Sequence, residues 1–260
     1  MTKPFIGVIH LSALPSAASA AGTFDSVLSE ALRDAEALAA GGVDGVIVEN
    51  FGDAPFHKGT RDDPVPPDVV GGLAIVARRV REEFRLDVGI NCLRNDGVAA
   101  LGAAVVSGAR WVRVNVLSGA YVTDQGLIEG EAARLRDYAQ QVQIPVEILA
   151  DYLVKHATPL GPLELVRGAK DLAERSGAAA IVLSGSRTGE PVDEAILVEV
   201  KGAVGTFPVW LGSGLDLDNA AALWPRCDGA IVGTALKRDG EVLAPVDPDR
   251  VREMRAALMG

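Results

Sequence analysis

The sequence contains few cysteines, few aromatic residues and no long apolar run. Its two cysteines, Cys92 and Cys227, lie far apart and lack the spacing of a metal site, so we interpret them as buried thiols in a reducing compartment. No stretch approaches the roughly 18 apolar residues of a membrane span. The N-terminal apolar stretch runs into His10 and a polar loop, which is not the form of a signal peptide. These absences predict a cytoplasmic protein without an integral membrane contact.

Basic residues are outnumbered by acidic ones. The sequence has 25 Lys and Arg residues and 35 Asp and Glu residues, which gives a net charge of −10. Phosphate backbones and anionic membrane surfaces attract basic patches. The charge therefore argues against a general affinity for nucleic acid. It leaves room for a local basic pocket that binds a small anion.

Hydrophobic residues make up 48% of the chain, and most of them are aliphatic. A core of Val, Ile, Leu and Ala is typical of a parallel sheet covered by helices. The length of 260 residues is ordinary for one α/β barrel, so we expect a single domain over residues 1–260.

Short apolar runs rich in β-branched residues alternate with segments of helical periodicity. The runs predict eight strands, at residues 5–11, 45–51, 86–93, 111–118, 146–153, 179–185, 208–214 and 229–236. Strand–helix alternation repeated eight times over about 250 residues is the outline of a (β/α)8 TIM barrel, in the α/β class. A doubly wound open sheet is the alternative, but no GxGxxG motif follows the first strand.

The predicted loops differ in length on the two sides of the barrel. Strand-to-helix connections are long, at residues 12–24, 52–66, 118–128 and 185–191, whereas helix-to-strand connections are short. In a barrel the strand-to-helix loops all lie at the C-terminal face, where active sites are built. The longest segment without helical pattern, 52–67, is a candidate lid or a docking ledge for a partner.

Polar residues occupy the predicted ends of six successive strands. Because these ends meet at one mouth of a barrel, we expect the side chains to converge there. They are His10, Glu49, Asn50, Asn91, Asn115, Asp151 and Ser184, followed in the fifth loop by Lys155 and His156. A purely structural barrel could carry apolar residues at the same places.

Glu49 and Asp151 are the candidate catalytic acid and base, because low-dielectric surroundings suit carboxylates to proton transfer. His10 is the complementary group, since histidine titrates near neutrality. The remaining polar residues at the mouth are candidate substrate-binding groups. Successive residues of a strand face opposite sides, so Glu49 and Asn50 need not both face the pocket, and the pattern leaves open which one does.

Arg113 lies mid-strand, in phase with Asn115, and Glu147 on the next strand is in phase with Asp151. Both side chains are therefore expected to point into the barrel. We predict a buried Arg113–Glu147 ion pair in which each charge satisfies the other and which orients Asp151.

A phosphate site is predicted after the seventh and eighth strands, where many barrels bind phosphate through backbone N–H groups and a helix N-terminus. The candidate residues are Gly212, Ser213 and Gly214 in the seventh loop and Gly233, Thr234 and Lys237 in the eighth. Glycines let the backbone approach the anion, and Lys237 is expected to supply a countercharge. In the sixth loop, Arg187 and Thr188 could grip a second anionic or hydroxyl-rich group.

Specific motifs are spread along the chain. They are "GVIHLSALP", "DGVIVENFGDAPF", "GINCLRND", "WVRVNVLSGAYVTDQGLIEG", "ADYLVKHATPLG", "SGSRTGEP", "LGSGL" and "DGAIVGTALKRDG". Together they resemble the BtpA/SgcQ family over nearly the whole chain. The resemblance implies a barrel of the ribulose-phosphate-binding kind and supports the phosphate site, but it implies no reaction. The namesake is implicated in photosystem I biogenesis, and the family also occurs in organisms without photosynthesis.

The sequence therefore predicts a cytoplasmic enzyme acting on a small phosphorylated sugar or nucleoside-like molecule, with isomerase, lyase and glycosidic-bond cleavage all open. One alternative is a non-enzymatic assembly or stability factor that uses the barrel as a scaffold. Another is a metal-dependent hydrolase built on His10, Glu49, Asp151 and His156, although no HxH or HExxH spacing supports a metal cofactor. Homo-oligomers are common among such barrels, but the sequence identifies no interface.

Overall fold

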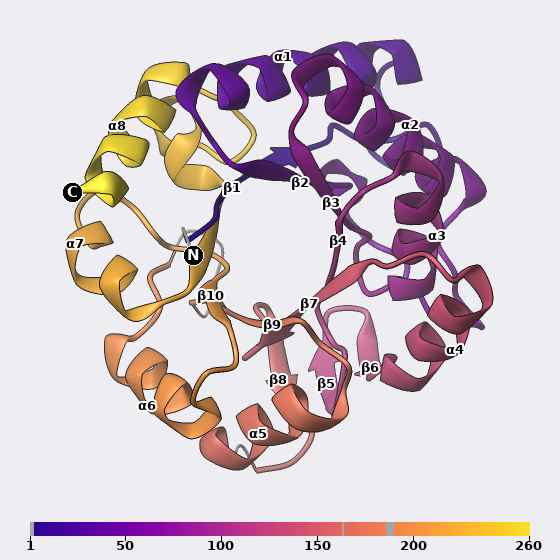
Figure 1. Cartoon of the computed structure of the whole chain (residues 1–260). Coiled ribbons are helices and arrows are strands. Elements are labelled where there is room, and N and C mark those ends of the chain that lie inside the picture. Colours follow the sequence, from indigo (N-terminus) through magenta and orange to yellow (C-terminus); the bar gives the residue numbers. More distant parts are fainter. Residues whose placement is uncertain (1–2, 163, 186–189) are drawn as a thin grey trace.

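Parallel strands close into a barrel in the computed structural model, which describes residues 3–162, 164–185 and 190–260. The barrel strands are β1 (Phe5–His10), β2 (Gly45–Glu49), β3 (Asp87–Asn91), β4 (Trp111–Val114), β7 (Glu147–Tyr152), β9 (Ala180–Leu183), β10 (Val209–Leu211) and β11 (Gly229–Val232). The last strand pairs with the first, with Phe5 opposite Ala230, which closes the ring (Figure 1). The predicted (β/α)8 barrel is confirmed, and the open-sheet alternative is wrong because β1 and β11 are not edges.

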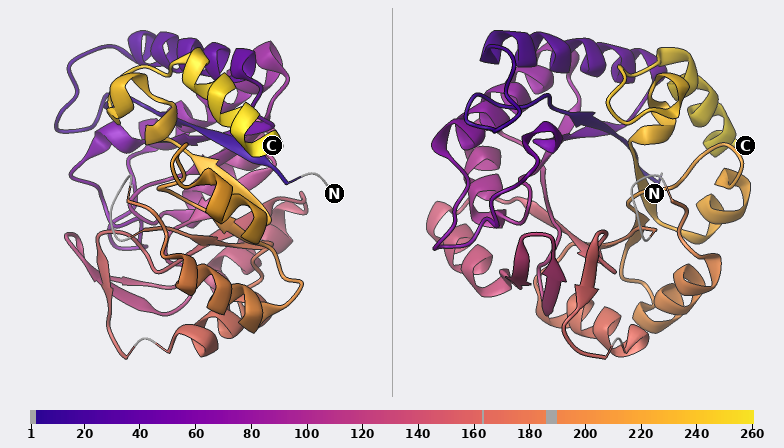
Figure 2. Two further views of the ribbon diagram at one scale, coloured as in Figure 1. Left: turned by 90° about the vertical axis from the view of Figure 1, so that its left-hand side faces the viewer. Right: turned by 180° about the vertical axis from the view of Figure 1, so that it is seen from behind.

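Helices surround this ring on its outside (Figures 1 and 2). They are α1 (Phe24–Gly41), α2 (Pro67–Phe84), α3 (Gly97–Ser107), α4 (Ala132–Val142), α5 (Leu165–Arg175), α6 (Glu194–Val204), α7 (Ala220–Leu223) and α8 (Pro248–Met259). Side-chain oxygens of Thr23, Asp96, Asp193 and Asp247 cap four of them by accepting an N–H of the first turn. Within the described ranges, no helix is long and apolar enough to cross a membrane.

A small antiparallel sheet is the main element that the sequence pattern missed. It consists of β5 (Ala120–Thr123), β6 (Gly126–Glu129) and β8 (Ala157–Pro159), which belong to the loops after β4 and β7. One face buries Tyr121 and Ile128. Its strands are too short and polar to be recognised, and β5 and β8 pair only because the two loops meet in space.

The inside of the barrel is filled by the side chains that alternate inward, and two tryptophans dominate it. Trp111 and Trp210 meet edge to face with ring centroids 6.2 Å apart. Space for Trp111 comes from neighbouring strands, because a Cβ atom at Gly45 would lie 2.9 Å from its ring and one at Gly89 would lie 3.0 Å from its Cβ. These glycines therefore permit the large aromatic core.

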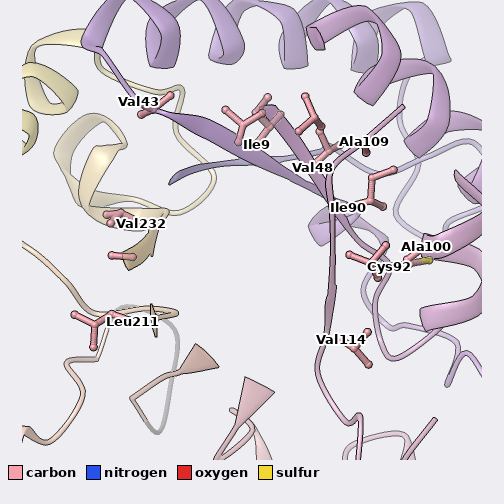
Figure 3. Close-up of a cluster of buried hydrophobic side chains, with 14 of the residues drawn as sticks. Ile9, Val43, Val48, Ile90, Cys92, Ala100, Ala109, Val114, Leu211 and Val232 are labelled. Atoms are coloured by element: carbon pink, nitrogen blue, oxygen red, sulfur yellow. The ribbon is translucent and has the colours of Figure 1, made fainter. Parts of the chain in front are cut away.

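A second apolar layer lies between the strands and the helices. Ile9, Val48 and Ile90, from three neighbouring strands, belong to it and are fully buried (Figure 3). Inward and outward positions are both mostly apolar along the strands, and the polar residues lie mainly near the strand ends, with Arg113 inside β4 as an exception.

Lys237 belongs to the loop after the last strand, and its side chain is 2% exposed. Its Nζ donates a hydrogen bond to Oδ2 of Asp34 on α1 at 2.6 Å. The other carboxylate oxygen of Asp34 accepts the backbone N–H of Val246 at 2.8 Å. Asp34 thus joins the last loop to the first helix beside the place where the barrel closes.

Lys237→Ala will destabilise the fold strongly, because it leaves the carboxylate of Asp34 largely buried without its cation. We expect the free energy of unfolding, measured by urea denaturation, to fall by about 3–5 kcal/mol. Arg78→Ala, which breaks an exposed ion pair with Glu82 on α2, is the control and should cost less than about 1 kcal/mol. Equal losses in the two variants would show that the Lys237–Asp34 pair does not hold the closure.

Candidate functional site

The polar residues at the ends of the first four strands lie side by side. Strand register places His10 opposite Glu49, Glu49 opposite Asn91, and Asn91 opposite Arg113. The strand ends therefore bring these groups together at the C-terminal mouth, as the sequence pattern indicated.

A cavity of about 240 Å³ opens at this mouth. The ends of the strands and their loops contribute His10, Glu49, Phe51, Arg113 and Lys155 to its walls. The loops after β10 and β11 contribute Gly212, Ser213, Gly214, Gly233 and Thr234. The candidate acid–base residue Glu49 and the candidate phosphate loops thus line one space.

Glu49 lines this cavity and is 8% exposed. Burial raises its pKa, and the positive charges of Arg113 and Lys155 only partly oppose the rise. Among the described residues, no hydrogen bond or ion pair engages its carboxylate. Glu49 is therefore the pocket-facing member of the pair that the sequence left undecided.

Asn50 does not line this cavity and contributes to the wall of a separate one, so its expected role in substrate binding stays a prediction. Its Oδ1 accepts the backbone N–H of Leu93 at 2.7 Å, and its Nδ2 donates to Oδ2 of Asp53 at 2.9 Å. Oδ1 of Asp53 in turn accepts the N–H of Leu14 at 2.8 Å. Asn50 thus ties together the loops that follow the first three strands.

Arg113 pairs with Asp151, so the predicted Arg113–Glu147 pair is wrong. Nε and Nη2 of Arg113 donate to the two carboxylate oxygens of Asp151 at 2.9 and 3.1 Å. Glu147 lies near the opposite end of β7, where it accepts the indole N–H of Trp111 at 3.0 Å. Burial opposes the guanidinium charge, but the Asp151 carboxylate outweighs it and raises the pKa of Arg113.

Asn91 and Asn115 continue this buried network instead of lining the cavity. Nδ2 of Asn115 donates to Asp151 at 2.8 Å, and Nδ2 of Asn91 donates to Oδ1 of Asn115 at 3.2 Å. Their expected contacts with substrate hydroxyls do not fit this arrangement, because their donors already serve the network. Both oxygens of Asp151 accept hydrogen bonds from this network, and its expected role as a catalytic acid or base stays a prediction.

Lys155 lines the cavity, while the neighbouring His156 is exposed and lies outside the lining. Nη2 of Arg94 donates to the backbone oxygen of Lys155 at 2.6 Å and fixes this segment. Burial, together with the charge of Arg113, lowers the pKa of Lys155 to about 8. Its amine therefore loses its proton at a lower pH than the amine of an ordinary lysine does.

His10 does not titrate near neutrality, contrary to the expectation from its residue type. Burial, and then the positive charges of Lys237, Lys155 and Arg113, lower its pKa to about 3. Its ring packs edge-on against Phe51, with centroids 4.8 Å apart. Nδ1 is buried and has no hydrogen-bond partner in the described part of the chain. His10 is thus a neutral imidazole in the cavity wall.

The loops after β10 and β11 are shaped by close approaches. Gly214 has a φ of 74°, and a Cβ atom there would lie 1.8 Å from the backbone oxygen of Glu190. A Cβ at Gly233 would lie 2.9 Å from Cε1 of His10. A side chain at Gly214 would clash with backbone, and one at Gly233 would displace the ring of His10, while both glycines line the cavity.

Lys237 does not supply the countercharge expected for this corner, because its Nζ is bound to Asp34 and it is absent from the cavity wall. Arg250, in the first turn of α8, lines the cavity instead. Its Nε donates to the backbone oxygen of Ala235 at 2.9 Å, which places the guanidinium beside the eighth loop. The sequence reasoning missed Arg250, since nothing in its local pattern shows that α8 returns to the mouth.

The sixth loop remains the least defined part of the prediction. Arg187 and Thr188 lie outside the described residues. Ser184 is buried, does not line the cavity, and its Oγ has no hydrogen-bond partner among the residues described. A Cβ at Gly212 would lie 2.7 Å from that oxygen, so Ser184 lies directly behind the seventh loop.

The proposed lid, residues 52–67, is anchored to the loop after β3. The backbone N–H of Arg94 donates to the oxygen of His57 at 3.0 Å, and a Cβ at Gly59 would lie 2.3 Å from the backbone nitrogen of Asp96. Part of the segment lines a separate small cavity, with Pro55 and Phe56 in its wall.

The four residues considered for a metal site do not converge. His156 is exposed, Asp151 is bound by Arg113, and only His10 and Glu49 share the cavity. Over the described ranges, no group of three or more His, Cys, Asp or Glu residues is arranged to hold a metal ion.

A larger cavity of about 560 Å³ lies between α4, α5 and the small sheet, and Asp151 near the end of β7 also contributes to its wall. Its polar groups are already engaged, because the hydroxyl of Tyr152 donates to the oxygen of Leu165 at 2.8 Å and Arg167 pairs with Glu164. The smaller cavity, with its unengaged Glu49 and Lys155, is therefore the stronger candidate site.

Comparisons with known proteins place the chain in a family. The model of the BtpA family matches residues 1–259. The chain is 47% identical to the photosystem I biogenesis protein BtpA of Synechocystis sp., over 96% of this chain and 85% of that protein. It is 44% identical to an uncharacterized protein of Thermococcus kodakarensis, over 97% of this chain and 94% of the relative.

Solved structures with the same fold have low sequence identity. Thiamine phosphate pyrophosphorylase from Pyrococcus furiosus superposes with a TM-score of 0.61 at 14% identity, covering 99% of this chain and 96% of that one. Orotidine 5'-phosphate decarboxylase from Pyrococcus horikoshii gives 0.57 at 15% identity, covering 98% and 100%. At such identities the likeness establishes the barrel fold.

Glu49→Gln will change how stability depends on pH. Because the pKa of Glu49 is raised in the folded state, the folded protein keeps this proton to a higher pH than the unfolded chain does. Wild-type stability therefore falls as pH rises between the two pKa values, whereas glutamine carries no charge at any pH. We expect the variant to gain stability relative to wild type as the pH rises above the ordinary pKa of a glutamate, by about 1.4 kcal/mol per unit of pKa difference.

Urea unfolding at a series of pH values measures this effect. Glu82→Gln, at an exposed site on α2, is the control and should stay within about 0.5 kcal/mol of wild type throughout. A stability difference between Glu49→Gln and wild type that does not change with pH would contradict the raised pKa.

Proposed function

The chain belongs to the BtpA family, and from this premise we propose that it is a cytoplasmic enzyme acting on a small phosphorylated sugar or nucleoside-like molecule. One observation carries the proposal. The same cavity that holds the glycine-rich loops after β10 and β11 also holds the unengaged side chains of Glu49 and Lys155. A ligand bound by its phosphate at those loops would extend toward both groups.

The phosphate would bind at the seventh and eighth loops. Open glycine backbone at Gly214 and Gly233 offers N–H groups to an anion, and Arg250 adds a positive charge from the first turn of α8. Structural neighbours support this choice of ligand, because several are named for phosphorylated compounds, including thiamine phosphate and orotidine 5'-phosphate.

Proton transfer would be the task of Glu49. A carboxyl group whose pKa is raised by burial can donate a proton near neutral pH and take it back as a carboxylate. Arg113, held by Asp151, places a fixed positive charge beside the reacting atoms and would stabilise a developing negative charge. Neutral His10 would accept or donate a hydrogen bond. This set suits isomerase, lyase or glycosidic-bond cleavage chemistry.

A second candidate is an assembly or stability factor. It is favoured by the relative from Synechocystis sp., which is named a photosystem I biogenesis protein and is 47% identical. The anchored segment 52–67 would then serve as the docking surface. A scaffold requires neither phosphate binding nor turnover, so ligand measurements separate the two candidates.

Arg250→Ala will weaken phosphate binding, because the variant removes the positive charge in the cavity wall. We expect the Kd for ribose 5-phosphate or inorganic phosphate, measured by calorimetry, to rise by about tenfold or more, which is about 1.4 kcal/mol. Arg252→Ala is the matched control, since Arg252 lies two residues further along the same helix, is exposed and pairs with Asp249. Equal affinities of the two variants would place the anion elsewhere.

Glu49→Gln will abolish turnover while it leaves binding intact, because glutamine keeps the shape of the side chain and removes the transferable proton. In a screen of sugar phosphates followed by NMR, we expect the rate on any converted compound to fall by a factor of about 100 or more, with the Kd unchanged. Glu82→Gln should retain the wild-type rate. Full activity of Glu49→Gln would remove this residue from the chemistry.

A further inference from the structure

Lys155 is an amine in the cavity wall without a partner for its ammonium group. Among the described residues, no ion pair or hydrogen bond engages its Nζ, whereas its backbone oxygen is fixed by Arg94 at 2.6 Å. Lys237, at the mouth of the same barrel, has its Nζ bound to Asp34. Of these two lysines, Lys237 has an ion-pair partner, whereas Lys155 has none among the described residues.

The charges around Lys155 explain why it has no partner. Asp151 is close enough to act on it electrostatically, but both of its oxygens are taken by Arg113. Arg113 and Arg94 add positive charge nearby, and Glu49 is the second carboxylate among the described residues that acts on it. Burial in this setting lowers the pKa of Lys155 to about 8. Its lone pair is therefore available for nucleophilic attack at mildly alkaline pH.

We infer that Lys155 is a nucleophile that forms an imine with the carbonyl carbon of an open-chain phosphorylated aldose or ketose. The inference rests on the proposed phosphate site and adds the substrate class and a covalent intermediate. The phosphate at the loops after β10 and β11 and the carbonyl at Lys155 would occupy different walls of one cavity, with Glu49 in the same lining.

The step balances without any further reactant. The lone pair of Nζ forms the C–N bond, the π electrons of the carbonyl move to its oxygen, and that oxygen takes up the proton that the nitrogen loses. Glu49 then protonates the hydroxyl group, the C–O bond breaks, and water leaves with those electrons. The product is an iminium ion, and Glu49 is left as a carboxylate that can remove a proton from the adjacent carbon.

Reductive trapping tests the inference on the full chain. The protein is incubated with dihydroxyacetone phosphate and sodium cyanoborohydride, which delivers hydride to an iminium carbon and leaves a stable secondary amine. Peptide mass spectrometry locates the adduct. We expect one adduct per chain, at Lys155, and labelling that is at least about tenfold slower with dihydroxyacetone, which lacks the phosphate.

Variants separate the covalent step from binding. Lys155→Arg keeps the positive charge but cannot form the imine, so labelling should disappear while calorimetric binding of inorganic phosphate remains. Glu49→Gln should slow labelling by about tenfold or more at unchanged phosphate affinity. Lys201→Arg, which alters a lysine paired with Asp228 outside the cavity, should label like wild type.

Two results would overturn the inference in distinguishable ways. Phosphate binding that persists while adducts are absent or spread over surface lysines such as Lys58 would refute the imine and leave the proposed function standing. Failure of both inorganic phosphate and dihydroxyacetone phosphate to bind would refute the proposed function and the imine together.

Discussion

The buried pair between Arg113 and Asp151 is the interaction on which the rest of the site depends. It joins neighbouring strands β4 and β7 through two hydrogen bonds and uses both oxygens of the carboxylate. Removing either partner would leave an uncompensated charge in the core, which is among the most costly changes a fold can undergo. Because Asn115 and Asn91 extend the same network, the pair also fixes the backbone at the ends of three strands.

The charge of Arg113 modifies the effect of burial on the groups that remain in the cavity. It lowers the pKa values of His10 and Lys155 in addition to the effect of burial, and it opposes the rise that burial causes in Glu49. The outcome is a neutral imidazole, an amine with a pKa of about 8 and a carboxyl group that holds its proton above the usual range. Enzymes commonly prepare a site for proton transfer near neutral pH by surroundings that shift the pKa values of its acids and bases in opposite directions.

The sequence was sufficient for the barrel and for the row of polar residues at its mouth, because alternation and strand ends are local properties. It did not predict the contacts that depend on how far a long side chain extends, or on which residues a helix distant in the sequence places at the site. Alternation placed Arg113 and Glu147 on the same side of the sheet, but it could not show that the guanidinium extends toward Asp151. Likewise, Lys237 lies outside the cavity and Arg250, which the sequence pattern did not single out, lines it, because the packing of α1 and α8 decides which cation reaches the cavity.

The contrast between Lys155 and Lys237 shows how one residue type acquires two roles at the mouth of one barrel. Asp34 accepts Lys237 with one oxygen and the N–H of Val246 with the other, so that lysine is committed to holding loop and helix together. The carboxylate of Asp151 is not free to form such an ion pair with Lys155, because Arg113 already binds both of its oxygens. A bidentate arginine is the better partner for a buried carboxylate, since its planar fork satisfies both oxygens at once. The stability of the Arg113–Asp151 pair is thus the physical reason that an amine is left unengaged beside Glu49.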